Sequence, residues 1–586
     1  MATGRQPFPG DTPGTVHDAI LNRAPVPAGR VNPELPLPIE GVINKALEKE
    51  RGLRYQHAAD LRAELQRLKR DTDFARAAAA GGVVARGRAR PGWGVKTGAA
   101  AGALALGALL ALGTWSAIFR AEGEAIDSIA VLPFANATND PNAEYLSDGI
   151  TETLINSLTQ LPRLRVTARS TVFRYKGKDA DSQKVGNDLR VRAVLSGRLL
   201  QQGDTLIVRT ELMDVSNGSQ LWGGQYSRKA SDVFALQEDL SREISEKLRL
   251  RLTPEERQRL TKRHTENANA YQLYLKGKYH WNKRSPEGIQ RAVEYFQQAV
   301  DTDPAYALAY AGLADSYNIM SFFNMVPPRS AMPKAKASAM KALEIDSGLA
   351  EPHISLGYAS FTFDWDWPAA RTHIDQALAL NASAVLNHTA YPFYLTVSGR
   401  PEEAVSVAQQ ALDRDPVSAS FSHNLAVQFH LAGQFDKAIE EGRRTIELDS
   451  DIAIAHDVLA MSFAAKGMYR EALLEMERAI ALSPASAVSL GNLGYVRARL
   501  GQRSEAQHIV EQLDAASRER YTPALAFAAV YSGLDEKDQA FTWLDKAYEE
   551  RCNRLAYLKN ESTWTGLRGD PRFDDLLRRI GLPASR

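Results

Sequence analysis

The chain has 586 residues, which is too long for one hydrophobic core and enough for several domains of roughly 100 to 200 residues each. Its 71 basic and 70 acidic side chains leave a formal net charge of +1, which argues against a nucleic-acid-binding protein with a strong basic field. The single cysteine, Cys552, excludes an intrachain disulfide and a cysteine-rich zinc site, and we expect it to be a small apolar residue of a terminal helix rather than a reactive thiol.

Residues 1–73 begin with loops rich in proline and glycine, and two amphipathic helices are expected near 39–50 and 58–70. The segment contains the motifs MATGRQPFPG at 1–10, LP at 35–36, INKALEK at 43–49, RY at 54–55 and DLRAEL at 60–65. Together these motifs resemble the end of the large lobe of bacterial serine/threonine protein kinases. The resemblance implies that Arg54 matches a buried arginine which pairs with a glutamate of the activation segment, and this chain has no such glutamate.

Phosphoryl transfer needs a glycine-rich loop over the phosphates, a lysine on a strand, a catalytic-loop aspartate and a metal-binding aspartate. The chain contains no HRD, DFG or APE motif and no glycine loop in a strand context. We therefore expect this chain not to be an enzyme and to have no catalytic residues, cofactor or metal site. Two origins of the kinase-like segment stay open: a coding sequence that begins late within a kinase gene, and a kinase whose catalytic part has been lost.

A membrane anchor is expected next. Residues 74–96 form a linker with five basic residues and no acid, and residues 97–119 (TGAAAGALALGALLALGTWSAIF) contain no charge. As a helix rising about 1.5 Å per residue, the uncharged stretch reaches roughly 34 Å, enough for a hydrocarbon core of about 30 Å. Acidic residues follow Arg120, so the positive-inside rule predicts a single-pass protein of the cytoplasmic (inner) membrane with a cytoplasmic amino terminus and an extracytoplasmic carboxy-terminal region. The alternatives are a buried soluble helix and a flexible tether.

Residues 126–252 alternate between strand and helix patterns, which predicts an α/β domain large enough to fold alone. Strands are expected at 126–134, 164–168, 193–200, 205–215 and 220–227, and helices at 143–161, 181–189 and 233–250. The domain contains the motifs IAVLPF at 129–134, EYLSDGITE at 144–152, RYKGK at 174–178 and LWGGQYSR at 221–228. These motifs resemble the amino-terminal domain of the periplasmic protein TolB, in the form found beside repeat arrays in bacterial kinases, adenylate cyclases and regulators. The resemblance implies a sensory or protein-interaction module.

Two groups of residues in this domain have a functional and a structural interpretation. Ser147, Asp148 and Thr151 are polar residues early in a helix, where they could bind an anion or partner, but helix entry is the favoured explanation. Trp222 and Tyr226 alternate on one strand face, and core packing is favoured there over a ligand platform.

From residue 267 to residue 586 the chain is predicted to be helical, and one set of alanines recurs every 34 residues. These alanines are Ala404, Ala438, Ala472, Ala506 and Ala540. A period of 34 is typical of tetratricopeptide (TPR) repeats, which are helix pairs that stack into an α-solenoid. We expect about eight repeats, an insertion near 322–333 in the less regular upstream part, and a terminal cap helix with a charged outer face at 564–579.

Stacked helix pairs create a concave groove lined by the first helix of each pair. The repeat register predicts six partner-binding residues there: Phe393, His423, His430, Asp457, Met461 and Tyr495. Each of them could instead be a packing or solvated residue, and the histidines lack the carboxylate or cysteine neighbours that a metal site requires. The aromatic run at 363–367 is expected to pack beneath a loop rather than to serve as an exposed anchor.

The sequence therefore predicts a mixed, mainly α-helical fold: a TPR α-solenoid, an α/β domain, one transmembrane helix and a helical kinase remnant. The favoured function is a membrane-anchored interaction or sensor protein that binds proteins or peptides and no nucleic acid. The alternative is the sensor half of a transmembrane serine/threonine kinase. A transcription regulator is disfavoured because no helix-turn-helix or basic DNA-reading segment precedes the membrane segment.

Overall fold

The computed structural model describes residues 126–138, 143–161, 163–178, 181–248, 252–254, 256, 262–386 and 388–583, together with Arg30, Val42, Ile43 and Lys45. The chain divides into two compact units, Met1–Ala121 and Glu122–Arg586. Apart from those four single residues, the kinase-like segment 1–73, the linker 74–96 and the predicted span 97–119 lie outside the described residues. Across the described ranges, no helix combines the length and the apolarity needed to cross a membrane.

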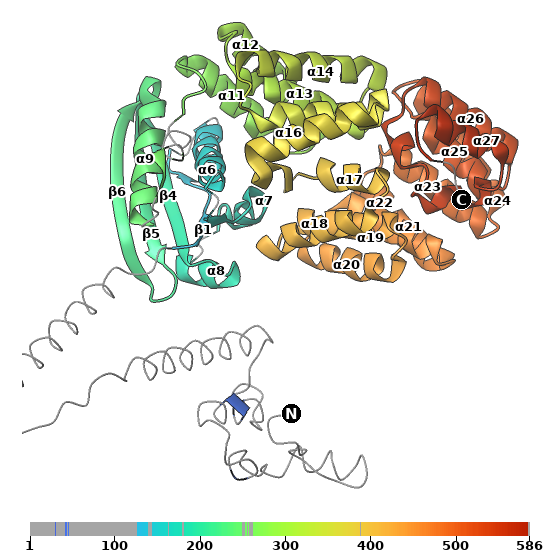
Figure 1. Ribbon diagram of the computed structural model, residues 1–586, viewed down its shortest axis with the longest axis horizontal. Helices are drawn as coiled ribbons and strands as arrows, with labels where there is room; N and C mark the ends of the chain where they lie inside the picture. Colours follow the sequence, from blue (N-terminus) through green and yellow to red (C-terminus); the bar gives the residue numbers. More distant parts are fainter. Residues whose placement is uncertain are drawn as a thin grey trace, which may run out of the picture. The chain divides into compact units, whose positions relative to one another are not determined.

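The second unit begins with a mixed β-sheet (Figure 1). Its strands are β1 (Ser128–Val131), β2 (Ala135–Asn136), β3 (Arg165–Val166), β4 (Ala193–Gln202), β5 (Thr205–Asp214) and β6 (Ser219–Lys229). The strand order is β3-β1-β4-β5-β6, with β2 also paired to β4. Strand β1 runs parallel to β3 and β4, whereas β4, β5 and β6 are antiparallel. All four residues of β1 are buried, as expected of a central strand with parallel neighbours.

Four helices accompany the sheet: α6 (Glu144–Thr159), α7 (Arg169–Val172), α8 (Ser182–Asp188) and α9 (Val233–Lys247). Helix α9 is amphipathic, and its Leu236, Leu240 and Ile244 are fully buried. Alternate residues of β5 are buried, which is the pattern of a strand with one face in the core. The α/β character, the longer helices and all strands except the two-residue β2 agree with the elements predicted from the sequence pattern.

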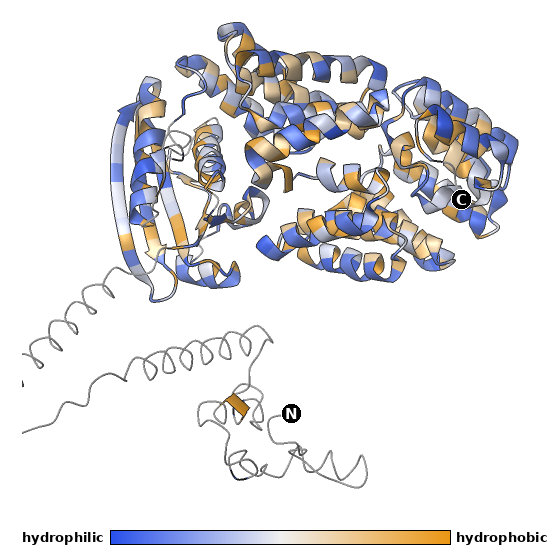
Figure 2. Cartoon of the chain, in the orientation of Figure 1, coloured by the Kyte–Doolittle hydropathy of each residue, from blue (hydrophilic) through white to orange (hydrophobic). Residues whose placement is uncertain are grey.

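The last strand, β6, is mostly exposed, and Figure 2 shows it coloured largely as hydrophilic. Its exceptions are Tyr226, which is buried, and Trp222, which packs partly buried against the same core. The two rings lie 6.3 Å apart on either side of Gly224, where a Cβ atom would collide with both. Core packing therefore accounts for the aromatic pair.

The described residues between 268 and 549 form eight helix pairs, numbered from α11/α12 to α25/α26 (Figure 1). The first four pairs are α11 (Ala268–Trp281) with α12 (Pro286–Thr302), α13 (Ala307–Phe322) with α14 (Pro328–Ile345), α15 (Ala350–Ala359) with α16 (Trp367–Leu386), and α17 (Ala390–Val397) with α18 (Pro401–Arg414). The other four are α19 (Ala419–Leu431) with α20 (Phe435–Leu448), α21 (Ala453–Ala465) with α22 (Tyr469–Leu482), α23 (Ala487–Arg499) with α24 (Arg503–Ser517), and α25 (Ala524–Gly533) with α26 (Lys537–Glu549).

The 34-residue period has a direct structural cause. Each of the five periodic alanines lies on the second helix of a pair and is fully buried. The turns inside the pairs repeat as well, because Gly399, Gly433, Gly467 and Gly501 all have left-handed backbones with φ between 74° and 80°. The alanines allow the helices to approach closely, and the glycines let the chain reverse between them.

The α/β domain and the first helix pair share one hydrophobic core. A single cluster of buried residues continues from β1 and α6 into α11 and α12. At the centre of this junction, a Cβ atom on Gly149 of α6 would lie 2.8 Å from the side chain of Leu275 on α11. The domain boundary expected between residues 252 and 267 therefore separates two kinds of sequence pattern, but the hydrophobic core continues from one side to the other.

The closing segment, which we define as Asn553–Leu567, differs from the predicted cap. It consists of two 3₁₀ helices, η6 (Asn553–Tyr557) and η7 (Ser562–Leu567), and Trp564 is only 1% exposed. The charged terminal helix, α27 (Pro571–Arg579), begins seven residues later than the predicted cap at 564, after Asp570 has capped its free amides. The prediction of one cap helix over 564–579 was wrong because its first residues are interior.

The aromatic run at 363–367 packs against this end of the chain, as predicted. Trp365 is 7% exposed, and its ring stacks on Tyr548 of α26 at 4.9 Å. The indole N–H of Trp367 donates to the carbonyl of Ile580 at 3.0 Å. Both contacts join residues that are far apart in the sequence, so the last repeats touch the early ones.

Candidate functional site

Five of the six predicted groove residues line one cavity of about 180 Å³. Phe393 lies on α17, His423 and His430 on α19, and Asp457 and Met461 on α21. The three helices are the first members of successive pairs, which is why the repeat register could place these side chains on one surface.

The sixth residue, Tyr495 on α23, lies apart from the other five. It lines a neighbouring cavity of about 1030 Å³ instead, which shares only Leu431 and Thr563 with the first one. Its backbone is tightly packed, since a Cβ atom on Gly533 would lie 2.8 Å from the Cα atom of Tyr495. Burial also raises the pKa of its hydroxyl to about 12. Tyr495 therefore lines the larger cavity and not the smaller one.

The closing segment supplies cavity residues that sequence analysis missed. Arg554, Tyr557, Glu561 and Thr563 all line the smaller cavity. The Tyr557 ring lies 5.2 Å from that of Phe393, and the amide of Asn560 donates to the carbonyl of Leu431. This segment lies outside the 34-residue period, so no pattern in the chain pointed to it.

An ion pair forms one wall of the cavity. The Nη2 and Nε atoms of Arg554 lie 2.6 and 3.2 Å from Oε1 of Glu561. The other oxygen of Glu561 accepts a hydrogen bond from the indole N–H of Trp564 at 3.3 Å. The guanidinium of Arg554 and the carboxylate of Glu561 therefore both have hydrogen-bond partners within the closing segment.

Asp457 differs from that pair because its hydrogen bonds come from neutral groups, and the charge of Arg554 acts on it without an ion-pair contact. Its Oδ1 accepts a hydrogen bond from Nδ2 of Asn492 at 3.1 Å, and no lysine or arginine among the described residues forms an ion pair with it. Burial raises the pKa of Asp457, and the hydrogen bond from Asn492 offsets only part of that effect.

The two histidines of the cavity are neutral near pH 7. Burial lowers the pKa of both His423 and His430 to about 4. Nδ1 of His430 pairs with the hydroxyl of Ser462 at 2.9 Å, whereas Nδ1 of His423 is buried without a hydrogen-bond partner among the described residues. The histidines thus contribute polar atoms and no charge.

The mouth of the cavity is apolar. Phe322, Phe323 and Ile454 line it, and they are 38%, 42% and 40% exposed. Phe322 and Phe323 lie at the end of α13, in the insertion that the sequence analysis located, and their rings meet edge to face at 5.1 Å. Large apolar side chains that gather at a pocket on a protein surface are typical of a binding site.

The described part of the chain offers no candidate group for metal binding or for thiol chemistry. No group of three or more histidine, cysteine, aspartate or glutamate side chains in that part could hold a metal ion. The thiol of Cys552 is buried, and burial raises its pKa to about 12, which suppresses the reactive thiolate.

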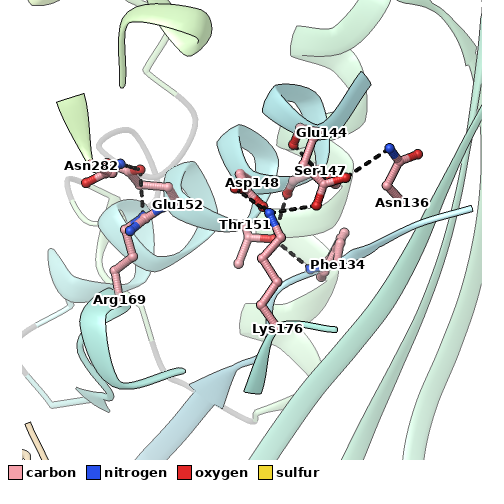
Figure 3. A network of polar contacts seen from close by, with 10 residues as sticks. All are labelled: Phe134, Asn136, Glu144, Ser147, Asp148, Thr151, Glu152, Arg169, Lys176 and Asn282. Atoms are coloured by element: carbon pink, nitrogen blue, oxygen red, sulfur yellow. Dashed lines mark hydrogen bonds and ion pairs between the residues drawn. The ribbon is translucent and has the colours of Figure 1, made fainter. Parts of the chain in front are cut away.

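The polar motif of α6, the other candidate from the sequence, is satisfied internally (Figure 3). Lys176 forms ion pairs of 2.6 Å with both Glu144 and Asp148. The hydroxyl of Thr151 donates to the carbonyl of Ser147 and accepts from the backbone N–H of Phe134, at 2.8 and 3.0 Å. The structural explanation therefore holds, but the predicted role in helix entry was wrong in detail, because the helix begins after Ala143 without a side-chain cap.

Glu152, at the end of the same motif, connects three elements (Figure 3). Its carboxylate lies 3.0 Å from Nε of Arg169, 2.9 Å from Nζ of Lys278 and 2.6 Å from Nδ2 of Asn282. Arg169 belongs to α7, whereas Lys278 and Asn282 lie at the end of the first repeat helix. Burial alone would raise the pKa of Glu152, but the nearby Lys278 and Arg169 lower it overall. This network joins the α/β domain to the repeats.

The fold and the cavity define a TPR α-solenoid protein with an α/β domain. Residues 125–246 match the family model described as the second domain of HilA/YgeH-like transcriptional regulators. The match covers the α/β domain only, and the predicted resemblance to TolB stays a prediction.

Three curated relatives match parts of the chain. The putative adenylate cyclase 3 of Rhizobium meliloti is 32% identical over 234 residues, which are 40% of this chain and 40% of that protein. The transcriptional regulator HilA of Salmonella typhimurium is 23% identical over 299 residues, 50% of this chain and 52% of HilA. A probable serine/threonine-protein kinase of Clostridium perfringens is 35% identical over 71 residues, 12% of this chain and 10% of the kinase. The chain thus spans about half or less of each relative.

Similar solved structures include TPR proteins. The TPR protein YrrB, whose peptide-binding site is described as unusual, is 20% identical and has a TM-score of 0.23, with 34% of this chain and 97% of YrrB covered. The human IFIT1 dimer with PPP-AAAA is 13% identical, with a TM-score of 0.40 and coverage of 77% and 97%. These scores are too low for details to be transferred, and the TPR class stands on the helix pairs and their period.

Proposed function

We propose that this chain is a membrane-anchored interaction protein that binds a protein or peptide partner in the cavity between α17, α19, α21 and the closing segment. The observation that carries the proposal is the set of exposed apolar side chains, Phe322, Phe323 and Ile454, in the lining of a cavity that also contains polar groups. Exposed apolar side chains gain free energy when a partner covers them, and polar groups inside a pocket supply specificity.

The relatives support an interaction or sensor role rather than a catalytic one. They are named as a cyclase, a transcriptional regulator and a kinase, which are three different activities. The matches to the cyclase and to HilA are each longer than the 121-residue amino-terminal unit, so both include part of the second unit. A region present in proteins with different outputs is suited to receiving a signal or partner.

The test is to obstruct the cavity. Val458 lines it on α21, so Val458→Arg places a long charged side chain inside, whereas Leu474→Arg makes the same charge change at a position of α22 that is 61% exposed. Binding of fluorescent, end-blocked hexapeptide pools to the full-length chain would be measured by polarisation. We expect binding to the wild type and to Leu474→Arg and a loss of at least about tenfold with Val458→Arg. Equal binding by both variants would contradict a peptide site in this cavity.

The membrane anchor in the proposal rests on the uncharged stretch 97–119 and the basic linker before it. In this proposal residues 126–583 lie outside the cytoplasm. Reporter fusions after residue 260 test this topology: activity of an alkaline phosphatase fusion supports it, and activity of a cytoplasmic reporter at the same position refutes it.

The alternative function is the sensor half of a transmembrane serine/threonine kinase. Two observations favour it: the kinase-like motifs of residues 1–73 and the 35% identity over 71 residues to a probable kinase. The coding DNA upstream of Met1 tests it directly. An in-frame extension with HRD and DFG motifs supports the kinase, whereas an in-frame stop codon together with a ribosome-binding site at Met1 contradicts it.

A further inference from the structure

The charges around the cavity favour one kind of ligand. Its ionisable lining consists of Asp457, Glu561, Arg554, His423 and His430. Because burial lowers the pKa of both histidines to about 4, they are neutral near pH 7. Two carboxylates and one guanidinium then remain, so the lining has a net charge of −1.

The two sides of the cavity differ in what they can still bind. Arg554 already donates through two nitrogens to Glu561, so an acidic ligand would have to break this pair or approach a net negative wall. Asp457 interacts with the amide of Asn492 and the hydroxyl of Ser489, both neutral, and forms no ion pair among the described residues. A carboxylate at an apolar surface without an ion-pair partner gains from a positively charged ligand.

The shape of α21 places that carboxylate within reach of the mouth. Ile454, Asp457 and Met461 are spaced i, i+3 and i+7, so they follow one face of the helix. Asp457 therefore lies one turn, about 4.5 Å along the axis, beyond the exposed Ile454. Met461 continues the same face, and Phe393 and Val427 from neighbouring helices add apolar walls. A long side chain with an aliphatic stem and a charged end fits here, because its stem can contact the apolar residues while its end reaches the Asp457 carboxylate.

We propose that the cavity binds a lysine or arginine side chain of the partner, with its charged end at Asp457 and its stem against Ile454, Met461 and Phe393. This inference rests on the proposed function, because it names the residue of the peptide that the cavity recognises. An acidic side chain is repelled by the net negative lining, and a neutral apolar one covers the Asp457 carboxylate without giving it a partner.

The experiment compares four pools of end-blocked fluorescent hexapeptides whose fixed central residue is lysine, arginine, norleucine or glutamate. Norleucine has the lysine stem without the charge, so it isolates the contribution of the ammonium group. The full-length chain is compared with Asp457→Asn, which keeps the shape of the side chain, and with Asp451→Asn, which removes an equal charge from an exposed turn in the same repeat. Circular dichroism verifies that each variant is folded.

We expect the wild type and Asp451→Asn to bind the lysine and arginine pools at least about tenfold more tightly than the norleucine pool, and the glutamate pool most weakly. Asp457→Asn should lose this preference while still binding the norleucine pool as the wild type does. Equal binding of lysine and norleucine by the wild type, or a lysine preference that survives in Asp457→Asn, overturns this inference alone. Binding of none of the pools to the wild type overturns the proposed function and this inference together.

Discussion

Glu152 offers the sharpest test of how the two parts of the second unit are joined. Glu152→Gln preserves the size of the side chain but removes the charge that Arg169 and Lys278 share. The variant leaves two cations beside each other in a partly buried junction, where water replaces the lost carboxylate only in part.

The expected magnitude follows from the burial of the network. Removing one member of a fully buried ion pair costs about 3–5 kcal/mol. Glu152 is buried, with a side chain 10% exposed, but Arg169 and Lys278 are 22% and 23% exposed, so water can partly rehydrate them. We therefore expect the junction to lose about 2–3 kcal/mol, which lies between the values for a buried pair and a surface pair.

Hydrogen exchange of backbone amides is the suitable assay, because repeat proteins open locally and a single melting temperature would mix several events. Amides of α6 and α11 should exchange about 25- to 150-fold faster in Glu152→Gln, since each 1.4 kcal/mol is a factor of ten. Amides of α22 should keep their rates, and Glu294→Gln, an exposed change on α12, should leave all rates unchanged. A change of less than about twofold at α6 and α11 would refute the role given to this network.

Three further predictions concern single residues of the helical region. Burial lowers the pKa of His430 to about 4 in the native state, whereas an unfolded histidine has a pKa of about 6.5. Below about pH 6.5 the unfolded chain therefore binds a proton that the native state does not bind. The free energy of unfolding is full above that pH and falls as the pH is lowered towards 4. The loss should reach about 2 kcal/mol at about pH 5, and urea titrations of His430→Gln should show a correspondingly smaller pH dependence. Gly467→Ala should destabilise its repeat by about 1 kcal/mol in urea titrations because its φ is 76°, whereas Gly569→Ala, also in open space but without a positive φ, should be neutral. Cys552, 1% exposed, should resist maleimide at about pH 7.5 and react fully in guanidinium, and rapid labelling of the native protein would contradict its burial.

The sequence by itself determined the parts of this structure that depend on local or periodic patterns. Ala472 and its periodic equivalents predicted the helix pairs, because a small residue is needed wherever two helices cross at the same place in each repeat. The alternating strands of the α/β domain were likewise evident from apolar periodicity. Phe393, His423, His430, Asp457 and Met461 were placed on one surface by the same register, and the structure brings them to one cavity.

Only the tertiary structure decided how that surface is divided and what completes it. The closing segment touches repeats more than two hundred residues earlier, as in the hydrogen bond from Asn553 to Ser321, whose sequence separation is 232. No repeat pattern records such a contact, because its energy comes from packing between surfaces that exist only after the solenoid has formed. For that reason Arg554 and Glu561 were missed, the separation of Tyr495 from the other five residues was not foreseen, and the neutral hydrogen-bond partners of Asp457 became visible only in the structure.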